Sequence, residues 1–547
     1  MPWMTLPDPG PRSIPRPAFE EQRAWRRRYL AICAAVLAAV MVALALLLLF
    51  VTLEMARRAI GWPLPLVALV ALAYGFFGQY VPGAFGHPGL PVASFLGTLT
   101  IAEGGLWGEL AGVSVGIVAV FVILGAVLNA GEAGQGFMNL SVMLAGNRTA
   151  GAAKVSLLSS AFFGSISGSA SANVASTGAF TLPAMKRLGY PPAFAGAVEA
   201  VASSGGQIMP PLMGAGAFVM VELLATTYPR VMEAAILPAI LFFVAVWVGV
   251  NAFARRYDLK PLGPEHRPGA RRVLVTGLFF LVPFAVLLHR MLVAGNTPQY
   301  AAALAILAAA ALLLVHYDGE RVRLSGRLLG GRLEQVALAS GQQIAMIASI
   351  ILCASIVVGV LGLTGLGVKV TSAILSISDG SLWPALLLTA LACLVLGMEV
   401  PTTAAYVICV SVAGPALTEL GLPPLLAHLF VFWYALLSTI TPPVCGTVFI
   451  AAGMVGAPWL RVAGHAMALG IGLYLIPLAM VASPALIAPL AEPWGAALGF
   501  LRVTLGLWLV SKAVVLRLAW PWKALGLLLG LAILMTPLRD MVAWLGL

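Results

Sequence analysis

The chain has 547 residues, of which 61% are hydrophobic and only 9% are charged, and its mean hydropathy is +1.00. A soluble domain carries about 25% charged residues, so this composition excludes a soluble protein and predicts one embedded in a bilayer. The net charge of +11 lies mostly in short loops, which predicts positive-inside topology and no nucleic-acid partner.

Apolar segments of the length needed to cross a bilayer recur along the whole chain. About twelve crossings are expected at about 20 residues each, including two regions near 192–226 and 424–456 that are apolar but broken in the middle. Residues 1–28, rich in proline and arginine, are predicted to form a disordered basic tail. The other predicted spans are 29–53, 62–82, 109–131, 228–250, 272–293, 298–317, 333–362, 459–483, 494–516 and 522–545.

A polar stretch, GSISGSASANVASTG, interrupts the apolar sequence at 164–178. The segment 150–187 around it is too long for one span and too short for two, which predicts a re-entrant helical hairpin. Non-helical backbone cannot face lipid, so the hairpin tip should line a polar cavity. The candidate ligand-binding residues of this first tip are Ser165, Ser167, Ser169, Ser171 and Asn173.

The apolar region that follows is broken at SSGGQIMPP, residues 203–211. Proline removes an amide donor and frees a carbonyl, and freed carbonyls beside hydroxyl groups suit a small cation. The candidate residues of this first break are Ser203, Ser204, Gly205, Gln207 and Pro210.

Two basic loops, 251–271 and 318–332, indicate the cytoplasmic face. Counting spans from them, the hairpin 150–187 enters from the inside and a second segment, 380–420, enters from the outside. The same count places the basic N-terminus outside, against the positive-inside rule. Either 92–107 also crosses the membrane, or the orientation of the N-terminus is unusual.

An internal repeat supports the opposite entry of these two segments. Residues 183–214 match residues 415–446 at a constant offset of 232, with 11 identities in 32 positions and both PP pairs aligned. Inverted repeats of this kind are typical of alternating-access carriers. The second copy supplies the tip residues Glu399, Pro401, Thr402 and Thr403 and the break residues Ser438, Thr439, Thr441 and Pro442.

The repeat predicts an all-α polytopic membrane protein with two re-entrant helical hairpins and two broken helices. The predicted parts are the tail 1–28, N-terminal scaffold helices 29–108, the first repeat 109–250, connecting scaffold helices 251–332, the second repeat 333–458, and C-terminal scaffold helices 459–547.

Catalytic and metal-binding motifs are absent from the sequence. It contains no GxxxxGK[ST] and no HExxH, and its five cysteines have no metal-like spacing, so no enzyme, organic cofactor or transition metal is expected. If the chain is an ion-coupled carrier, the coupling cation is expected to be Na⁺ or H⁺, and Na⁺ would use the tip and break oxygens. Glu399 is the best candidate for a proton carrier or gate, although tip amides could simply hold it. Glu199 and Glu222 are expected to make interhelical hydrogen bonds.

Three segments carry a family resemblance: FFGSISGSASANVASTGAFTLPAMKR, GMEVPTTAAYV and TPPVCGTVF. They resemble the large membrane subunit of TRAP (tripartite ATP-independent periplasmic) transporters, and the ISGSASANV form is similar to the TAXI branch of fused permeases. The resemblance implies an inverted-repeat elevator transporter in the cell inner membrane. It also implies that the tips and breaks named above form the substrate and ion region.

The resemblance further implies ion-coupled uptake of organic acids, chiefly carboxylates, delivered by a periplasmic solute-binding protein. The region before the large-subunit part holds only about two spans, so either the fusion is reduced or a separate small membrane subunit is needed. Two functional alternatives stay open. One is a stand-alone ion–carboxylate symporter that needs no binding protein, and the other is a passive anion channel.

Overall fold

The computed structural model describes residues 16–102, 104–317, 322–324, 326–398, 400–443, 445–516 and 519–536. Nearly all of this is helical, and two short strands, β1 (Val315–Tyr317) and β2 (Val322–Leu324), form one antiparallel ribbon. Within the described residues seven helices are long and apolar enough to cross a membrane, or eight if one bent pair counts as a single span. The predicted all-α polytopic membrane fold is therefore confirmed, with fewer full-length spans than the twelve expected.

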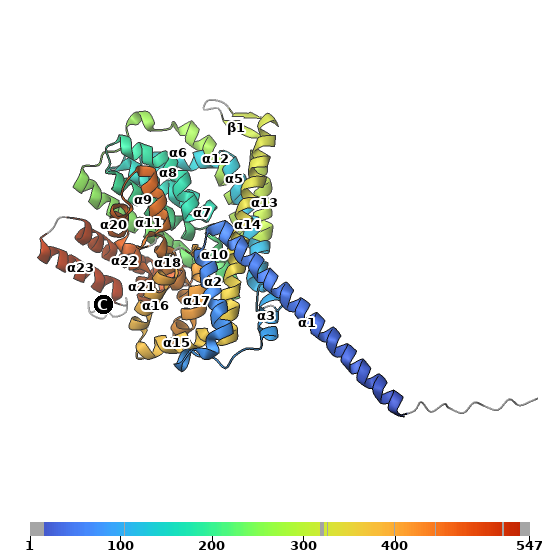
Figure 1. Cartoon of the computed structure of the whole chain (residues 1–547). Coiled ribbons are helices and arrows are strands. Elements are labelled where there is room, and N and C mark those ends of the chain that lie inside the picture. Colours follow the sequence, from blue (N-terminus) through green and yellow to red (C-terminus); the bar gives the residue numbers. More distant parts are fainter. Residues whose placement is uncertain are drawn as a thin grey trace, which may run out of the picture.

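The N-terminal region is dominated by one long helix that leaves the body of the protein (Figure 1). This helix begins at Arg16, so the prediction of disorder is wrong for residues 16–28, while 1–15 lie outside the described residues. The segment predicted as an optional crossing, 92–107, contains a helix of only nine residues, about 14 Å long, which is too short to cross a bilayer. The elements are α1 (Arg16–Ile60), α2 (Pro63–Phe77), η1 (Gly78–Tyr80), η2 (Gly83–Phe85) and α3 (Val92–Thr100).

The first repeat contains the hairpin and the broken helix at its centre. The hairpin arms are α7 (Gly151–Ser167) and α8 (Ala170–Arg187), and the broken helix runs from α9 (Pro192–Gly205) through η4 (Gly206–Ile208) to α10 (Ala215–Leu223). The flanking elements are α4 (Glu109–Val113), η3 (Ser114–Val118), α5 (Ala119–Ala130), α6 (Ala133–Ala145) and α11 (Tyr228–Tyr257).

The connecting region departs from prediction at 298–317. The helix there ends at Leu312 and the chain enters β1 at Val315, so the predicted 20-residue span is a 15-residue helix. At 1.5 Å per residue this is about 22 Å, shorter than the hydrocarbon core of a bilayer. The helical elements are η5 (Pro264–His266), α12 (Ala270–Leu288), η6 (His289–Val293) and α13 (Pro298–Leu312).

The second repeat has the same order of elements as the first. Its hairpin consists of α16 (Leu382–Leu396) and α17 (Thr402–Glu419), and its broken helix of α18 (Pro424–Leu437), η7 (Ser438–Ile440) and α19 (Gly446–Val455). Adding 232 to the residue numbers that bound α8, α9 and η4 gives the bounds of α17, α18 and η7. The preceding helices are α14 (Gly326–Thr364) and α15 (Leu366–Ile377).

The C-terminal region departs from prediction at 459–483, where one span was expected. Gly470 and Gly472 interrupt the helix there, and the chain bends sharply between α19 and the next helix, at 120°. Of the predicted span 522–545, only the part up to 536 lies within the described residues. The elements are α20 (Trp459–Leu469), η8 (Ile471–Tyr474), α21 (Ile476–Ala482), η9 (Pro484–Ile487), α22 (Pro493–Val515) and α23 (Trp520–Met535).

The turn between hairpin and broken helix explains the repeated LGxPP sequence. Gly189 has a φ of +75° after the end of α8, its amide donates to the Lys186 carbonyl, and the Tyr190 amide donates to the Met185 carbonyl. This is the Schellman arrangement, which favours glycine. Proline then occupies the first position of α9, where no amide donor is needed. The second copy repeats the arrangement around Gly421.

The two copies are interleaved. The half-helix α19 of the second copy packs against α8 and α9 of the first, and α10 of the first packs against α17 of the second. The long helix α14 runs along one side of the body and contacts α1, α2, α5 and α17 (Figure 1). The hairpins and breaks are therefore assembled from both copies and are bordered by a single long helix.

Close backbone contact fixes the first hairpin tip against the first break. A Cβ atom added at Gly164 would lie 2.3 Å from the Cα of Gly206, and one added at Gly206 would lie 2.4 Å from the Cα of Gly164. No side chain fits between them, so α7 and η4 cross in direct backbone contact. Small residues allow this close approach of helices in membrane proteins.

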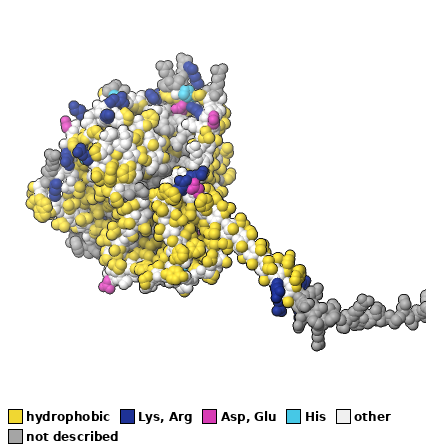
Figure 2. All heavy atoms as spheres, viewed as in Figure 1, with side chains coloured by type: hydrophobic (Ala, Val, Ile, Leu, Met, Phe, Trp, Pro, Cys, Tyr) yellow, Lys and Arg dark blue, Asp and Glu magenta, His cyan; other side chains and the backbone are white. Residues whose placement is uncertain are grey.

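The outer surface is mostly apolar, as a bilayer requires. Figure 2 shows hydrophobic side chains over most of the body, with lysine and arginine gathered mainly at the end where β1 and α12 lie. The two basic loops predicted to be cytoplasmic, 251–271 and 318–332, lead into α12 and follow β1.

The Gly164–Gly206 crossing gives the first prediction. Gly206→Ala should lower the free energy of unfolding by about 1–3 kcal/mol, because its methyl group would meet backbone that must shift. The measurement is thermal denaturation of the detergent-solubilised protein. Gly134→Ala on α6, where an added Cβ meets nothing within 4 Å, is the matched control. Equal melting temperatures for the two variants would contradict the crossing.

Candidate functional site

A cavity of about 340 Å³ lies where the two hairpin tips meet the two breaks. The first tip ends at Gly168, whose φ of +61° turns the chain between α7 and α8. Ser169 then caps α8, because its hydroxyl accepts a hydrogen bond from the Ala172 amide at 3.3 Å. The second tip turns at Pro401, directly before α17.

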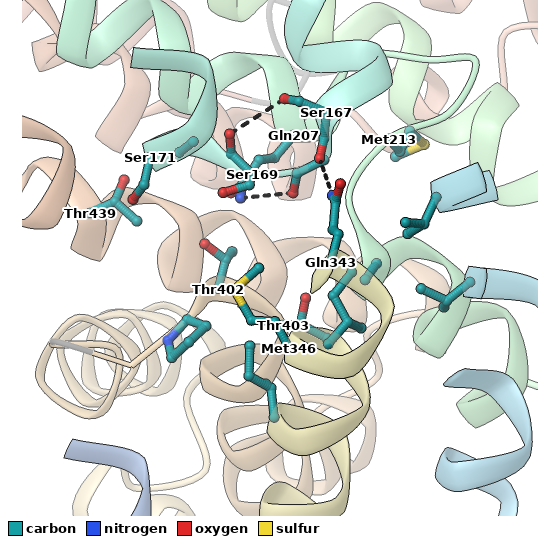
Figure 3. Close-up of a pocket in the computed structure, with 18 of the residues that line it drawn as sticks. Ser167, Ser169, Ser171, Gln207, Met213, Gln343, Met346, Thr402, Thr403 and Thr439 are labelled. Carbon is teal, nitrogen blue, oxygen red and sulfur yellow. Dashed lines mark hydrogen bonds between the residues drawn. The ribbon is translucent and has the colours of Figure 1, made fainter. Parts of the chain in front are cut away.

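Nine of the predicted site residues line this cavity (Figure 3). In the close-up, tip residues from the first copy and tip residues from the second copy approach it from opposite sides. The nine are Ser167, Ser169, Ser171 and Gln207 of the first copy and Pro401, Thr402, Thr403, Ser438 and Thr439 of the second.

The other predicted site residues do not line the cavity. The Ser165 hydroxyl donates to the Phe162 carbonyl in its own helix, and the Ser204 hydroxyl pairs with the Thr439 hydroxyl at 3.0 Å, which links the two breaks. Glu399 lies outside the described residues. Those placed elsewhere are Ser165, Asn173, Ser203, Ser204, Gly205, Pro210, Thr441 and Pro442.

Free hydroxyl groups face the cavity. Within the described residues the hydroxyls of Ser171, Thr402 and Thr403 have no hydrogen-bond partner, and the buried Gln207 Oε1 has none either. The Gln207 Nε2 is committed, because it donates to the Gly168 carbonyl at 3.1 Å. The Gln207 oxygen and Thr402 are buried, Thr403 is half-buried and Ser171 is exposed. All four groups are available to contact a bound molecule, and the buried oxygen of Gln207 is costly to leave without a partner.

The cavity walls carry no charged side chain among the described residues. Instead, the N-termini of α8 and α17 both lie at it, since Ala170 and Thr402 are lining residues. Helix N-termini present unpaired amide groups and the positive end of the helix dipole, which favour an anion. The chemistry offered is therefore neutral hydrogen bonding to a negatively charged group.

The long helix α14 supplies a wall that the sequence alone did not reveal. Gln343 donates to the Ser167 carbonyl at 2.9 Å, and Met346, Ile347 and Ile350 complete this side. Burying a polar side-chain amide in an apolar span costs free energy, so such residues are often functional. The GQQ sequence at 341–343 could therefore have marked this helix as part of the site. The apolar wall from Phe121, Met213 and Phe218 had no comparable signal.

Asn173 is the buried connection between tip and break. Its side-chain amide donates to the Ser160 carbonyl at 2.9 Å and to the Ser203 carbonyl at 3.2 Å, and it is fully buried. It thus ties α7, α8 and α9 together behind the cavity. Its role in this structure is to hold the site in shape.

The two hairpins, two broken helices and the cavity between them define a polytopic membrane transporter built as an inverted repeat. The family described as the tripartite ATP-independent periplasmic transporter, DctM component, matches residues 46–495. The chain belongs to this family, and the predictions of a TRAP large membrane subunit and of a multi-pass inner-membrane protein are confirmed.

Named relatives agree with this assignment. The C4-dicarboxylate TRAP transporter large permease protein DctM of Pseudomonas aeruginosa is 26% identical over 344 residues, covering 62% of this chain and 77% of that protein. The sialic acid TRAP transporter large permease protein SiaM of Vibrio cholerae is 22% identical over 364 residues, covering 66% and 82%. The isethionate TRAP transporter permease protein DctMQ of Oleidesulfovibrio alaskensis is 25% identical over 344 residues, covering 62% and 52%.

The position of Asn173 gives a second prediction. Asn173→Ala should lower the free energy of unfolding by about 1–3 kcal/mol, since two buried hydrogen bonds are lost. Thermal denaturation in detergent measures this, with Asn147→Ala on the exposed turn before α7 as the control. A melting temperature for Asn173→Ala equal to that of the control would show that the amide does not hold the tip.

Proposed function

We propose that this chain is the membrane permease of a tripartite carrier that takes up organic acids, chiefly carboxylates, delivered by a periplasmic solute-binding protein. The observation that carries the proposal is a cavity whose described lining residues carry no charge, and at which two helix N-termini and three hydroxyl groups without a partner in the described chain converge. The names of the relatives fit it, because C4-dicarboxylates, sialic acid and isethionate are all small organic anions.

Recognition of the anion would rest on hydrogen bonding alone. The hydroxyls of Ser171, Thr402 and Thr403 would donate to a carboxylate, and the N-terminal amides of α8 and α17 would add further donors. Hydrogen bonds to a charged group are worth about 1.5–3 kcal/mol each. No lysine or arginine of the described chain lines the cavity, so the carboxylate would be held by hydrogen bonds and not by an ion pair.

Uptake against a gradient needs a coupling cation, which we take to be Na⁺ or H⁺. The Oε1 of Gln207, which lines the cavity and has no partner in the described chain, is a neutral oxygen that Na⁺ would use. A cation bound there would lie close to the anion and would lower the cost of carrying it through apolar surroundings.

The movement would be of the elevator type. The two hairpins and their broken helices interleave into one unit, and within the described residues a single side-chain hydrogen bond, from Gln343 to Ser167, joins this unit to α14.

We further propose that the chain is a TAXI-type fused permease. Reconstitution with and without a separate small membrane subunit tests whether the fusion is complete.

Removing a free hydroxyl should weaken substrate binding. Thr402→Val and Ser171→Ala should each raise the KM for uptake by roughly 10-fold or more, as expected for the loss of a hydrogen bond to a charged group. The control is Ser372→Ala on α15, whose hydroxyl is exposed and bonded within its own helix. Unchanged KM values for both cavity variants would place the substrate elsewhere.

Reconstitution tests the whole proposal. The purified chain in proteoliposomes should accumulate a labelled carboxylate only when the binding protein encoded beside its gene is supplied, and only under a Na⁺ gradient or a pH gradient. The substrate is identified by testing uptake of C4-dicarboxylates, sialic acid and isethionate in turn.

The controls for that experiment separate the alternatives. Accumulation of free substrate without the binding protein would instead indicate a stand-alone symporter. Equilibration down the substrate's own gradient, without any imposed ion gradient, would indicate a passive anion channel. Either result would overturn the tripartite proposal.

A further inference from the structure

A fully buried carboxylate lies behind the cavity, surrounded by hydroxyl groups. Glu199, on α9, has 0% of its surface exposed. Two neighbouring helices, α7 and α8, and α9 itself turn hydroxyls toward it, and all of these groups are buried. The members of this Glu199 cluster are Glu199, Ser156, Ser160, Thr177, Thr181 and Ser203.

Each helix contributes a pair of residues four positions apart. Ser156 and Ser160 lie on α7, Thr177 and Thr181 on α8, and Ser203 lies one turn after Glu199 on α9. Residues at i and i+4 share one face of a helix, so the three faces meet at the carboxylate. Regular spacing on all three helices makes the cluster a built feature.

The hydroxyls divide between the two carboxylate oxygens. Ser156 donates to Oε2 at 2.7 Å and Thr181 donates to the same oxygen. Thr177 donates to Oε1, which Ser203 and Ser160 approach at 3.3 Å and 3.4 Å. All of these groups are neutral, so they satisfy the hydrogen bonding of the carboxylate without cancelling its charge.

In the described part of the chain no positively charged side chain pairs with the carboxylate. Within the described residues no lysine, arginine or histidine nitrogen lies within 4.0 Å of it. Lys154 on α7 instead places its ammonium 4.7 Å from the centre of the Trp247 ring. The other titratable side chains on the helices packed against α9 are Lys186 and Arg187 on α8, Tyr228, Arg230, Glu233, Arg255, Arg256 and Tyr257 on α11, and Arg461 and His465 on α20.

The second repeat shows that the fold does not need this cluster. At the constant offset of 232, its buried positions are occupied by apolar or weakly polar side chains in the same helical frame. Thr177, Thr181, Glu199 and Ser203 correspond to Cys409, Ala413, Val431 and Ala435. The same hairpin and half-helix therefore pack without a carboxylate, and a buried charge is costly where packing alone would suffice.

We propose that Glu199 is the site at which the coupling ion binds, and that this ion is a proton. The hydroxyls contact the carboxylate directly by O–H···O hydrogen bonds, so a metal ion would have to separate every pair. A proton adds no volume and removes the charge, and rotation of the hydroxyls lets them accept from the new O–H group. Protonation removes the charge of this buried carboxylate, which lowers the cost of moving the hairpin unit past apolar surroundings.

The cluster is connected to the cavity by short steps. The Ser203 carbonyl accepts from Asn173, and the Ser204 hydroxyl pairs with Thr439, which lines the cavity. Loading of the proton is thereby linked to the same tip and break that face the substrate. This inference rests on the proposed function, since it names the ion that drives it.

Infrared difference spectroscopy between low and high pH tests protonation without any substrate. The full chain in nanodiscs should show the carbonyl band of a protonated carboxylic acid, and Glu199→Gln should lose it. Glu222→Gln should keep the band. Glu222 is half-buried on α10 and has no hydrogen-bond partner in the described chain. Glu199→Asp should keep a band at a shifted wavenumber, which makes the test independent of how well the glutamine variant folds. An identical band in all three variants would overturn the proposal.

Transport supplies the second readout. In proteoliposomes with the binding protein, Glu199→Gln should lose pH-driven accumulation at least 10-fold while still exchanging labelled for unlabelled carboxylate, and Glu222→Gln should behave like the wild type. Wild-type accumulation driven by Na⁺ alone would overturn the proton site and leave the tripartite function standing. Absence of accumulation under every gradient would overturn the tripartite function and the proton site with it.

Discussion

Backbone that leaves a helix inside a membrane has no water to bond, and this constraint shapes the centre of the protein. The first hairpin tip meets it with partners from three places. Gln207 donates to the Gly168 carbonyl, Gln343 donates to the Ser167 carbonyl, and the Ser169 hydroxyl accepts from the Ala172 amide. Two of these partners come from the first break and from α14, which line the same cavity as the tip.

The two repeats solve the same packing problem with different chemistry. Both use a Schellman turn, a proline at the start of the half-helix and a break before a Pro–Pro pair. Behind the break, the first copy places a hydroxyl-lined carboxylate where the second places Val431 and its apolar neighbours. The backbone of the hairpin and half-helix therefore does not depend on the ionisable group that the first copy carries. The two copies differ in their side chains more than in their backbone.

Much of this architecture could be predicted from sequence, because glycine, proline and serine mark turns and breaks locally. The hairpins, the half-helices and the offset of 232 all follow from such marks. The break near Gly470 was missed because average hydropathy does not register two glycines inside an apolar run. Residues 16–28 were misjudged because the prolines end at Pro17 and helix-forming residues follow.

The candidate site was harder to predict than the fold. Which tip residues face the cavity depends on the rotation of α8 and α17, so Ser171 lines it whereas Asn173 points to the break. The contribution of α14 depends on a contact between residues 176 positions apart. The three pairs at i, i+4 spacing around Glu199 were visible in the sequence, but nothing there showed that they share a centre.

The border between α14 and the hairpin unit has a mechanical consequence. One amide hydrogen bond crosses it beside the cavity, and the rest of that wall is formed by Met346, Ile347 and Ile350. A net hydrogen bond is worth only about 0.5–1.5 kcal/mol, and apolar contacts are non-directional, so one set can be exchanged for another with little loss. The border therefore has one directional contact in an otherwise apolar interface, so little free energy holds the two sides in this particular position.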